Sequence, residues 1–149
     1  MEHPNPQFER ESWINLNGKW RFAFDFGKSG MDRRMYLADE DTKKLYGQTI
    51  NVPFCPESKL SGVEYKDFIQ AVWYQREFTL GQEELKGRVL LHFGAVDYKT
   101  QVFMNGEKVG EHIGGYSSFS FDITEYVKQG ENTVAVYAED NVRSGVQPR

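Results

Sequence analysis

The chain has 149 residues, of which 15% are aromatic and 27% charged, and its formal net charge is −4 at pH 7. This length is typical of one domain and allows folding to bury about two-thirds of the surface that the unfolded chain exposes. The Lys and Arg residues are scattered, which argues against nucleic-acid binding, because that needs a basic stripe to neutralise phosphates. No apolar run approaches the roughly 18 residues that cross a bilayer, so we expect no membrane contact.

The N-terminus and the single cysteine bear on the setting of the chain. Residues 1–12 are polar and contain prolines, so we expect an irregular arm and no secretory signal there. Cys55 has no second cysteine with which to form an internal disulfide. Its neighbours Pro53 and Phe54 favour a small half-buried thiol over a reactive one. These features predict a reducing, cytoplasmic location.

Short strands separated by turn residues dominate the first half of the chain. In residues 19–25, Trp20, Phe22 and Phe24 alternate with Lys19, Arg21 and Ala23, which predicts a strand. The helical spacing of Met31, Met35 and Tyr36 predicts one short helical insertion in the irregular segment 27–47. The other elements expected up to residue 87 are strands at 48–52 and 71–80, a long loop at 53–70 and a charged connector at 81–87.

The clearest local signal is Asn105-Gly106, because this pair accepts the positive φ angles of a two-residue hairpin turn. Alternating strands flank it at 99–104 and 107–113. Gly114-Gly115 then interrupts the pattern, and we interpret it as a bend that lets the chain change sheets. Residues 117–123 show the cleanest period of two, so we expect three successive antiparallel strands with one apolar and one polar face.

The remaining segments complete an antiparallel fold. Residues 88–93 are apolar on both faces, which predicts a central strand that is covered twice. We further expect a helical turn at 122–127 with Asp122 or Thr124 as N-cap, a strand at 131–138 and polar coil at 139–149. Together these elements predict an all-β fold, an antiparallel jelly-roll β-sandwich, in a single domain of residues 1–149.

Five sequence blocks follow one another in a characteristic order: VPFCPES at 52–58, VWY with Arg76 at 72–76, FGAVDY at 93–98, MNGEKVG at 104–110, and HIGGYSSF at 112–119 leading into FDIT at 121–124. They resemble the N-terminal jelly-roll domain of glycoside hydrolase family 2, which includes β-galactosidases, β-glucuronidases and β-mannosidases. The resemblance implies a galactose-binding domain-like sandwich. It also implies two catalytic glutamates in a (β/α)₈ barrel, which this chain is too short to contain.

The resemblance gives an expectation for the C-terminus as well. In the family, a segment like residues 147–149 is followed by a closing strand and further domains. We therefore expect a fragment of a longer enzyme that is truncated before the closing strand. An unclosed sandwich exposes a strand edge, so we expect self-association through that edge.

No residue pattern predicts a catalytic residue, a metal site or a cofactor in this chain. The acidic runs 39–41 and 83–84 are typical of solvated surfaces, and Asp97 favours a role as an acceptor for backbone N–H groups in a turn. The three histidines, His3, His92 and His112, lack neighbouring ligands at metal-site spacing. We therefore expect the chain alone to hydrolyse no glycoside.

Sugar contact is the remaining candidate activity. Aromatic faces and planar polar groups hold sugars, and the loop 53–70 offers Tyr65, Asp67, Phe68 and Gln70. The resemblance implies that this loop runs toward the active site of the barrel. The alternative is that Tyr65 and Phe68 pack the loop down while Asp67 is solvated. The three tryptophans are predicted to pack in the core or between domains: Trp13, Trp20 and Trp73.

Three functions stay open at this point. The first is the non-catalytic N-terminal domain of a β-galactosidase-like or β-glucuronidase-like enzyme, which shapes the pocket rim and packs against the remaining domains of its parent. The second is a stand-alone carbohydrate-binding module, because the same sandwich serves that purpose widely. The third is a structural or interaction domain without a ligand, which predicts an apolar patch that a partner buries.

Overall fold

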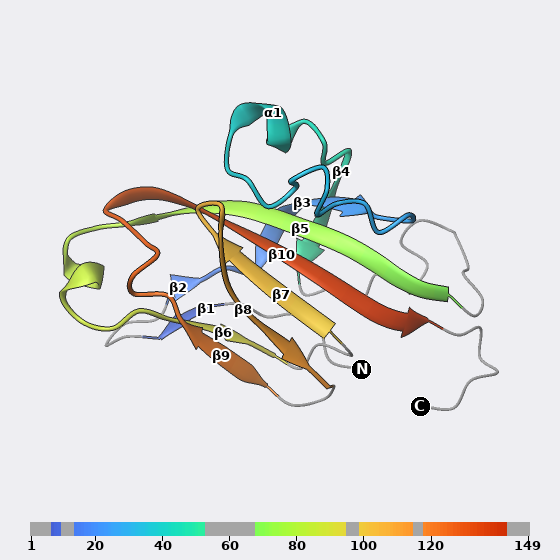
Figure 1. Ribbon diagram of the computed structural model, residues 1–149. Coiled ribbons are helices and arrows are strands. Elements are labelled where there is room, and N and C mark those ends of the chain that lie inside the picture. Colours follow the sequence, from blue (N-terminus) through green and yellow to red (C-terminus); the bar gives the residue numbers. More distant parts are fainter. Residues whose placement is uncertain (1–6, 10–13, 53–67, 95–98, 115–117, 143–149) are drawn as a thin grey trace.

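Two antiparallel sheets packed face to face form the body of the protein (Figure 1). The computed structural model describes residues 7–9, 14–52, 68–94, 99–114 and 118–142. The strand order is β2-β1-β6-β9 in one sheet and β4-β3-β5-β10-β7-β8 in the other. All pairs between the described strands are antiparallel, which confirms the predicted all-β sandwich.

The four-stranded sheet consists of β1 (Gln7–Glu9), β2 (Ile14–Asn15), β6 (Leu90–Phe93) and β9 (Phe119–Asp122). The six-stranded sheet consists of β3 (Gly18–Phe24), β4 (Gln48–Val52), β5 (Phe68–Leu80), β7 (Lys99–Met104), β8 (Glu107–Ile113) and β10 (Gly130–Val142). The two short helices are α1 (Glu40–Lys43) and the 3₁₀ helix η1 (Glu83–Lys86). At the centre of the larger sheet, β5 and β10 pair along their whole length.

The inter-sheet core follows directly from the alternation in the sequence. Side chains of one parity in the larger sheet, such as Trp20, Phe22 and Tyr74, meet Leu91 and Phe93 of the smaller sheet, and all five are buried. Burial of large apolar side chains is the main stabilising contribution in such a sandwich.

A second apolar core lies on the opposite face of the six-stranded sheet. Trp73, Phe103 and Tyr137 point away from the inter-sheet core, yet at most 5% of each is exposed. The segment between β3 and β4 covers them with Met35 and Tyr46. Figure 1 shows this insertion, which includes α1, above the larger sheet.

Asp25 anchors the start of the insertion, although it is only 2% exposed. Its Oδ1 accepts a hydrogen bond from the Ser29 N–H, and its Oδ2 accepts one from the Gly30 N–H, both at 2.8 Å. Trp73 Nε1 also donates to Oδ2, at 3.1 Å. A Cβ atom at Gly30 would lie 2.1 Å from Trp73 Nε1, so the chain has room there only for glycine. These contacts join the insertion to the sheet beneath it.

The short helical insertion was predicted in the correct segment but at the wrong residues. Met31, Met35 and Tyr36 lie in turns, and the helix is α1, at Glu40–Lys43. Asp39 is its N-cap, and its side chain accepts a hydrogen bond from the Thr42 N–H at 2.7 Å. Of the two methionines, Met35 is buried against the sheet and Met31 is exposed, so their spacing does not reflect a helix.

Three predicted boundaries were wrong because strand pairing extends beyond the apolar residues. Residues 7–9 of the expected arm form β1, which pairs with β6. The end of the predicted loop, 68–70, belongs to β5, and the start of the predicted coil, 139–142, belongs to β10. These last two segments pair with each other, with Phe68 opposite Val142. Each of these segments gains its strand partner from a distant part of the sequence.

The hairpin prediction is confirmed. Asn105 and Gly106 have φ angles of 53° and 87°, and β7 pairs with β8. Beyond the turn itself, Asn105 Oδ1 accepts a hydrogen bond from the Thr133 N–H at 2.9 Å, which ties the turn to β10. A sequence pattern gives no sign of this contact.

The three strands expected around the bend are present, and they are divided between the two sheets. The strand after the bend, β9, pairs with β6 in the other sheet. Gly114, with a φ angle of 119°, lies where the chain leaves β8, which agrees with its interpretation as part of a bend between sheets.

Two further local predictions need correction. The expected helical turn at 122–127 is a shorter turn at 124–126, in which the Tyr126 N–H donates to Ile123 O at 2.9 Å. Asp122, the last residue of β9, precedes it and accepts hydrogen bonds at Oδ1 from the Thr124 N–H and hydroxyl. β6 lies inside its sheet, but Leu90 and His92 are only half-buried while Leu91 and Phe93 are buried. One face of β6 is therefore fully covered instead of both.

Candidate functional site

The structure tests the predicted sugar-contact residues only in part. Tyr65 and Asp67 lie outside the described residues. Phe68 and Gln70 form the start of β5, where their Cα partners in β10 are Val142 and Asp140. Their assignment to a loop was therefore wrong, whereas their role in sugar contact stays a prediction.

The described surface carries one notable open cleft, of about 450 Å³, on the outer face of β3, β4 and β5. The polar residues that line it include Asn17, Lys19, Arg21, Thr49, Gln75 and Glu77. Its one aromatic lining residue, Trp20, is 2% exposed and donates its Nε1–H to Leu16 O at 2.8 Å. The cleft therefore offers no open aromatic face for a sugar ring.

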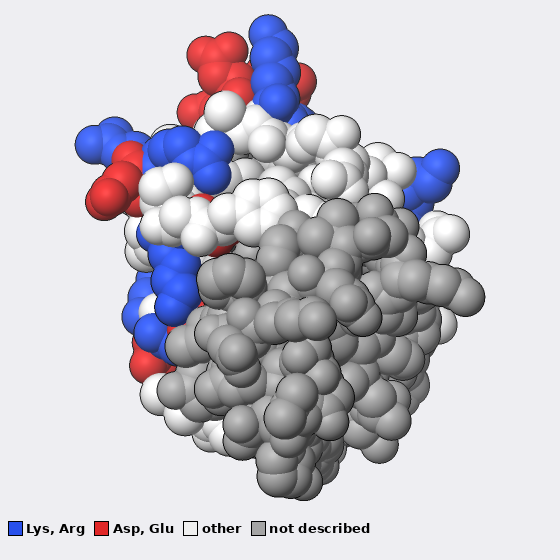
Figure 2. Space-filling view, turned by 90° about the vertical axis from the view of Figure 1, so that its right-hand side faces the viewer, with Lys and Arg blue, Asp and Glu red and all other residues white. Residues whose placement is uncertain are grey.

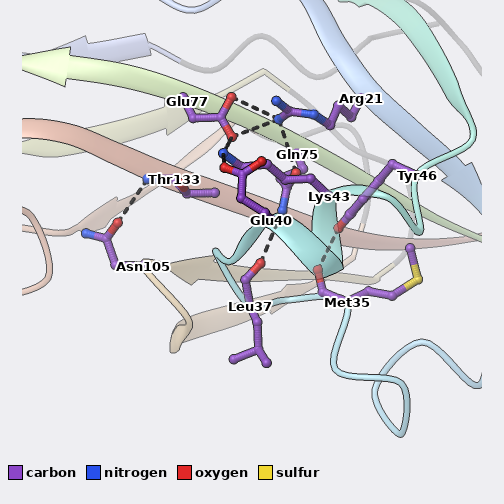
Figure 3. A network of polar contacts seen from close by, with 10 residues as sticks. All are labelled: Arg21, Met35, Leu37, Glu40, Lys43, Tyr46, Gln75, Glu77, Asn105 and Thr133. Carbon is purple, nitrogen blue, oxygen red and sulfur yellow. Dashed lines mark hydrogen bonds and ion pairs between the residues drawn. The ribbon is translucent and has the colours of Figure 1, made fainter.

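A network of charged side chains borders this cleft (Figure 3). Arg21 Nη1 donates to both carboxylate oxygens of Glu77, at 2.9 and 2.8 Å, and to Gln75 Oε1 at 3.1 Å. Lys43 of α1 lies 3.4 Å from Glu77 Oε2 and 3.0 Å from Glu40 Oε2. The hydrogen bond to Glu40 is the main cause that raises the pKa of Lys43.

Gln75 joins the same network to the insertion. It is fully buried, and its Nε2 donates to Leu37 O at 3.2 Å while its Oε1 accepts from Arg21. Lys43 brings α1 to the same carboxylate, that of Glu77. These contacts therefore hold the insertion on β3 and β5. Glu77 forms ion pairs with two side chains, Arg21 and Lys43.

Two of the described carboxylates, Glu111 and Asp122, do not suit general acid catalysis of glycoside cleavage. A glycosidase acid needs a raised pKa so that it keeps its proton near neutral pH. Hydrogen bonds instead lower the pKa of Glu111, chiefly from Gln101, and that of Asp122 to about 2, chiefly from Thr124. The acidic residues predicted to be solvated, 39–41 and 83–84, are exposed or half-exposed, although Asp39 also caps α1.

Other sequence-based site predictions have mixed outcomes. Asp97, Cys55, His3 and Trp13 lie outside the described residues. Trp20 and Trp73 are buried in the two cores, which confirms them as packing residues. Within the described ranges, His, Cys, Asp and Glu side chains form no group of three that would hold a metal ion. In the same part of the chain, no helix is long and apolar enough to span a membrane.

The charged residues show mixed signs on the face in Figure 2. Lys and Arg side chains lie beside Asp and Glu side chains over the insertion and along one side of the described surface. A nucleic-acid interface would instead gather cations in one stripe.

Comparisons with known proteins agree with this fold. Residues 13–142 match the family model for the glycosyl hydrolases family 2, sugar binding domain. The β-glucuronidase of Felis catus is 33% identical over 134 residues, which are 85% of this chain and 20% of that protein. The β-galactosidase of Thermoanaerobacter pseudethanolicus is 39% identical over 85 residues, which are 56% of this chain and 11% of that protein.

Solved structures show the same likeness. A β-glucuronidase of an uncultured Clostridium species superposes with a TM-score of 0.70 at 28% identity and covers 90% of this chain. The chain spans 22% of that structure, as it spans only a fifth or less of the curated relatives just described. The family match over most of the chain, together with the two-sheet fold, shows that this chain belongs to the family of sugar binding domains of glycosyl hydrolases family 2.

Proposed function

We propose that this chain acts as the non-catalytic sugar-binding domain of a longer glycosidase of the β-glucuronidase type. The observation that carries the proposal is the match to a β-glucuronidase over 134 residues, which are only 20% of that enzyme. The β-galactosidase match is shorter, at 85 residues, which favours the glucuronidase over the galactosidase.

The chemistry of the described residues favours a non-catalytic role for this domain. Glycoside hydrolysis needs two carboxylates placed on either side of the scissile bond, one of which must hold a proton. Glu77 is held by Arg21 and Lys43, and Asp122 by Arg88 at 2.6 Å. Both carboxylates are already paired with cations of the domain itself, so we expect the catalytic pair in a separate domain.

The proposed contribution to the substrate pocket is a rim of four residues: Tyr65, Asp67, Phe68 and Gln70. Tyr65 and Phe68 would provide aromatic faces, and Asp67 and Gln70 would accept or donate hydrogen bonds to sugar hydroxyls. The position of Phe68 and Gln70 at the start of a long paired strand supports this proposal, because a strand end holds the adjoining residues on a rigid base.

The first experiment is to sequence the source DNA downstream of the Arg149 codon and to express the whole open reading frame. We expect the product to hydrolyse 4-nitrophenyl β-glucuronide faster than the β-galactoside, and the 149-residue chain to hydrolyse neither. In the whole enzyme, Tyr65→Ala and Asp67→Asn should raise KM more than they lower kcat. A stop codon after Arg149, with glycan binding by the chain alone, would instead favour a free-standing carbohydrate-binding module.

Two further properties belong to this proposal. The single cysteine supports a cytoplasmic setting, which fractionation of the source cells would test. The exposed strand edges of an open sandwich support self-association, in addition to contacts with other domains of the enzyme.

A further inference from the structure

We propose that β4 (Gln48–Val52) is a dimerisation edge, at which two copies of this chain pair their β4 strands antiparallel about a two-fold axis at Ile50. The inference rests on the self-association proposed above and names its strand and register. It does not depend on which glycoside the longer enzyme cleaves.

The four outermost strands of the two sheets differ in how their edges are covered. These strands are β2 and β9 in the smaller sheet and β4 and β8 in the larger one. β2 has only two residues. On the β8 and β9 side the two sheets approach closely, since a Cβ atom at Gly110 would lie 2.8 Å from the Phe121 ring. The opposite side of the larger sheet ends at β4.

The two edges of the larger sheet also differ in protection. β8 carries three charged residues, Glu107, Lys108 and Glu111, and its pairing with β7 has a register shift between Val102 and Phe103. Charges and bulges are the usual means of preventing edge-to-edge association. β4 carries no charged residue and pairs with β3 in unbroken register at all five positions. Within the described residues, β4 is therefore the longer regular edge without these protections.

The sequence of β4 is compatible with its own antiparallel copy. A two-fold axis at Ile50 places Ile50 opposite its counterpart and Thr49 opposite the second copy's Asn51. Thr49 and Asn51 are exposed on the outer face, whereas Ile50 and Val52 are buried toward the core. Each cross-strand pair on the outer face is thus polar and uncharged. On the inner face Ile50 meets its counterpart, and the exposed Gln48 lies opposite the second copy's Val52.

Cations in the neighbouring strand do not oppose this pairing. Arg21 lies opposite Thr49 and Lys19 opposite Asn51 in β3. In the dimer, Arg21 of one copy and Lys19 of the other are three strand spacings apart, about 14 Å. This exceeds the Debye length of about 8 Å at physiological ionic strength, so their repulsion is largely screened. Because five paired residues bury little surface, we expect a weak, concentration-dependent dimer.

The test is sedimentation equilibrium of the 149-residue chain over about two orders of magnitude in concentration, with the double variant T49E/N51E beside it. In the dimer, the carboxylate at position 49 faces the carboxylate at position 51 of the other copy. Within one copy, the same two positions face Arg21 and Lys19, so the monomer should stay folded. We expect the dissociation constant to rise about tenfold, as two directly opposed like-charge pairs imply.

The control S120E/Q129E adds the same charge at two exposed positions away from β4 and should dimerise like the wild type. Mixing T49E/N51E with T49K/N51K places opposite charges across the two-fold axis and should restore the dimer. A wild-type chain that stays monomeric at every concentration overturns the proposal. So does a T49E/N51E variant that dimerises like the wild type, or a mixture that stays monomeric. None of these results depends on glycosidase activity, so each is distinguishable from failure of the proposed function.

Discussion

The six-stranded sheet has two buried faces, and they are built in different ways. Its inner face meets a second sheet, and strand residues such as Phe22 and Leu91 supply both sides of that core. Its outer face meets an irregular insertion, and only one side of that core, which includes Trp73, comes from strands. A sheet that is apolar on both faces needs a cover on each.

The two cores also differ in what holds the cover in place. The four-stranded sheet is held by the larger apolar core, whereas the insertion combines a smaller apolar core with several polar contacts. The polar contacts are those of Asp25 at the start of the insertion, the hydrogen bond from Gln75 of β5 to Leu37 O, and the ion pair of Lys43 with Glu77. Within the insertion, the Tyr46 hydroxyl donates to Met35 O at 2.7 Å. Because the apolar core beneath the insertion is smaller than the inter-sheet core, we infer that the insertion opens independently of the sandwich.

The largest effect is expected from Phe22→Ala in the inter-sheet core. Phe22 is fully buried and packs edge-to-face on Tyr74 at a centroid distance of 5.3 Å. Its truncation should lower the free energy of unfolding by about 3–5 kcal/mol, and the whole chain should unfold in one transition. Urea denaturation followed by far-UV circular dichroism measures this change. A loss below about 1 kcal/mol would show that this core does not hold the sandwich together.

Asp25→Ala should have a smaller and more local effect. It leaves the N–H groups of Ser29, Gly30 and Trp73 without their acceptor, at an expected cost of about 2–4 kcal/mol. Hydrogen exchange should accelerate in residues 25–47 while β6 and β9 stay protected. Asp25→Asn, which keeps one oxygen acceptor, should lose less. Equal acceleration in both sheets would contradict the independence of the insertion.

Alkaline pH should loosen the outer core first. Burial is the main cause that raises the pKa of Tyr46 above its ordinary value of 10.0, and it likewise raises that of Tyr137. The folded state therefore keeps these protons where the unfolded state loses them, so stability is full below pH 10 and falls as the pH rises further. Tyr46→Phe should flatten this fall and cost about 1 kcal/mol at neutral pH through the lost hydrogen bond. Thermal unfolding between neutral pH and pH 11 measures both changes.

Lys43→Met should have a still smaller effect on the outer core. It removes the contacts to Glu40 and Glu77 but keeps most of the aliphatic side chain, so we expect a loss of about 0.5–1 kcal/mol. High salt should reduce the difference between variant and wild type, because it screens the ion pairs. The matched control is Lys86→Met, whose contact to Glu83 is much more exposed, and which should be nearly neutral.

The smallest effect on stability is expected from Asp122, in β9 of the four-stranded sheet, at acid pH. Hydrogen bonds from Thr124, and then from Arg88, lower the pKa of Asp122 to about 2 from 3.8. Its contribution to stability is therefore present above pH 3.8 and is lost as the pH falls toward 2. Asp122→Asn should remove this part of the acid dependence. An unchanged melting profile between pH 4 and pH 2 in the variant and the wild type would contradict it.

The predictable parts of the fold are those that neighbouring residues specify. Asn105-Gly106 requires a tight turn whatever surrounds it, and the alternation from Trp20 to Phe24 defines a strand with one apolar face. The ends of β5 and β10 were missed because residues 68–70 and 139–142 become strands only by pairing with each other. The insertion was misread because Met31 and Met35 are spaced as in a helix although turns bring Met35 onto the sheet.

The polar network of the candidate site was invisible in the sequence for the same reason. The network joins three distant parts of the chain: Arg21 meets Gln75 and Glu77 through the pairing of β3 with β5, and the insertion brings Lys43 to Glu77. One signal was available: Arg21 has the opposite parity to Trp20 and Phe22, so it had to point away from the inter-sheet core. Its partners follow only once the register places Gln75 opposite it.

The thirteen-residue pairing of β5 with β10 has a mechanical consequence. A slip of one residue would turn Trp73 into the inter-sheet core and Val72 out of it. The two strands therefore pair in a single fixed register. The point where the chain enters β5 at Phe68 is therefore fixed beside the point where it leaves β10 at Val142. A segment attached after Val142 starts at the end of the sheet that carries the proposed sugar rim, and the sheet itself sets its starting position.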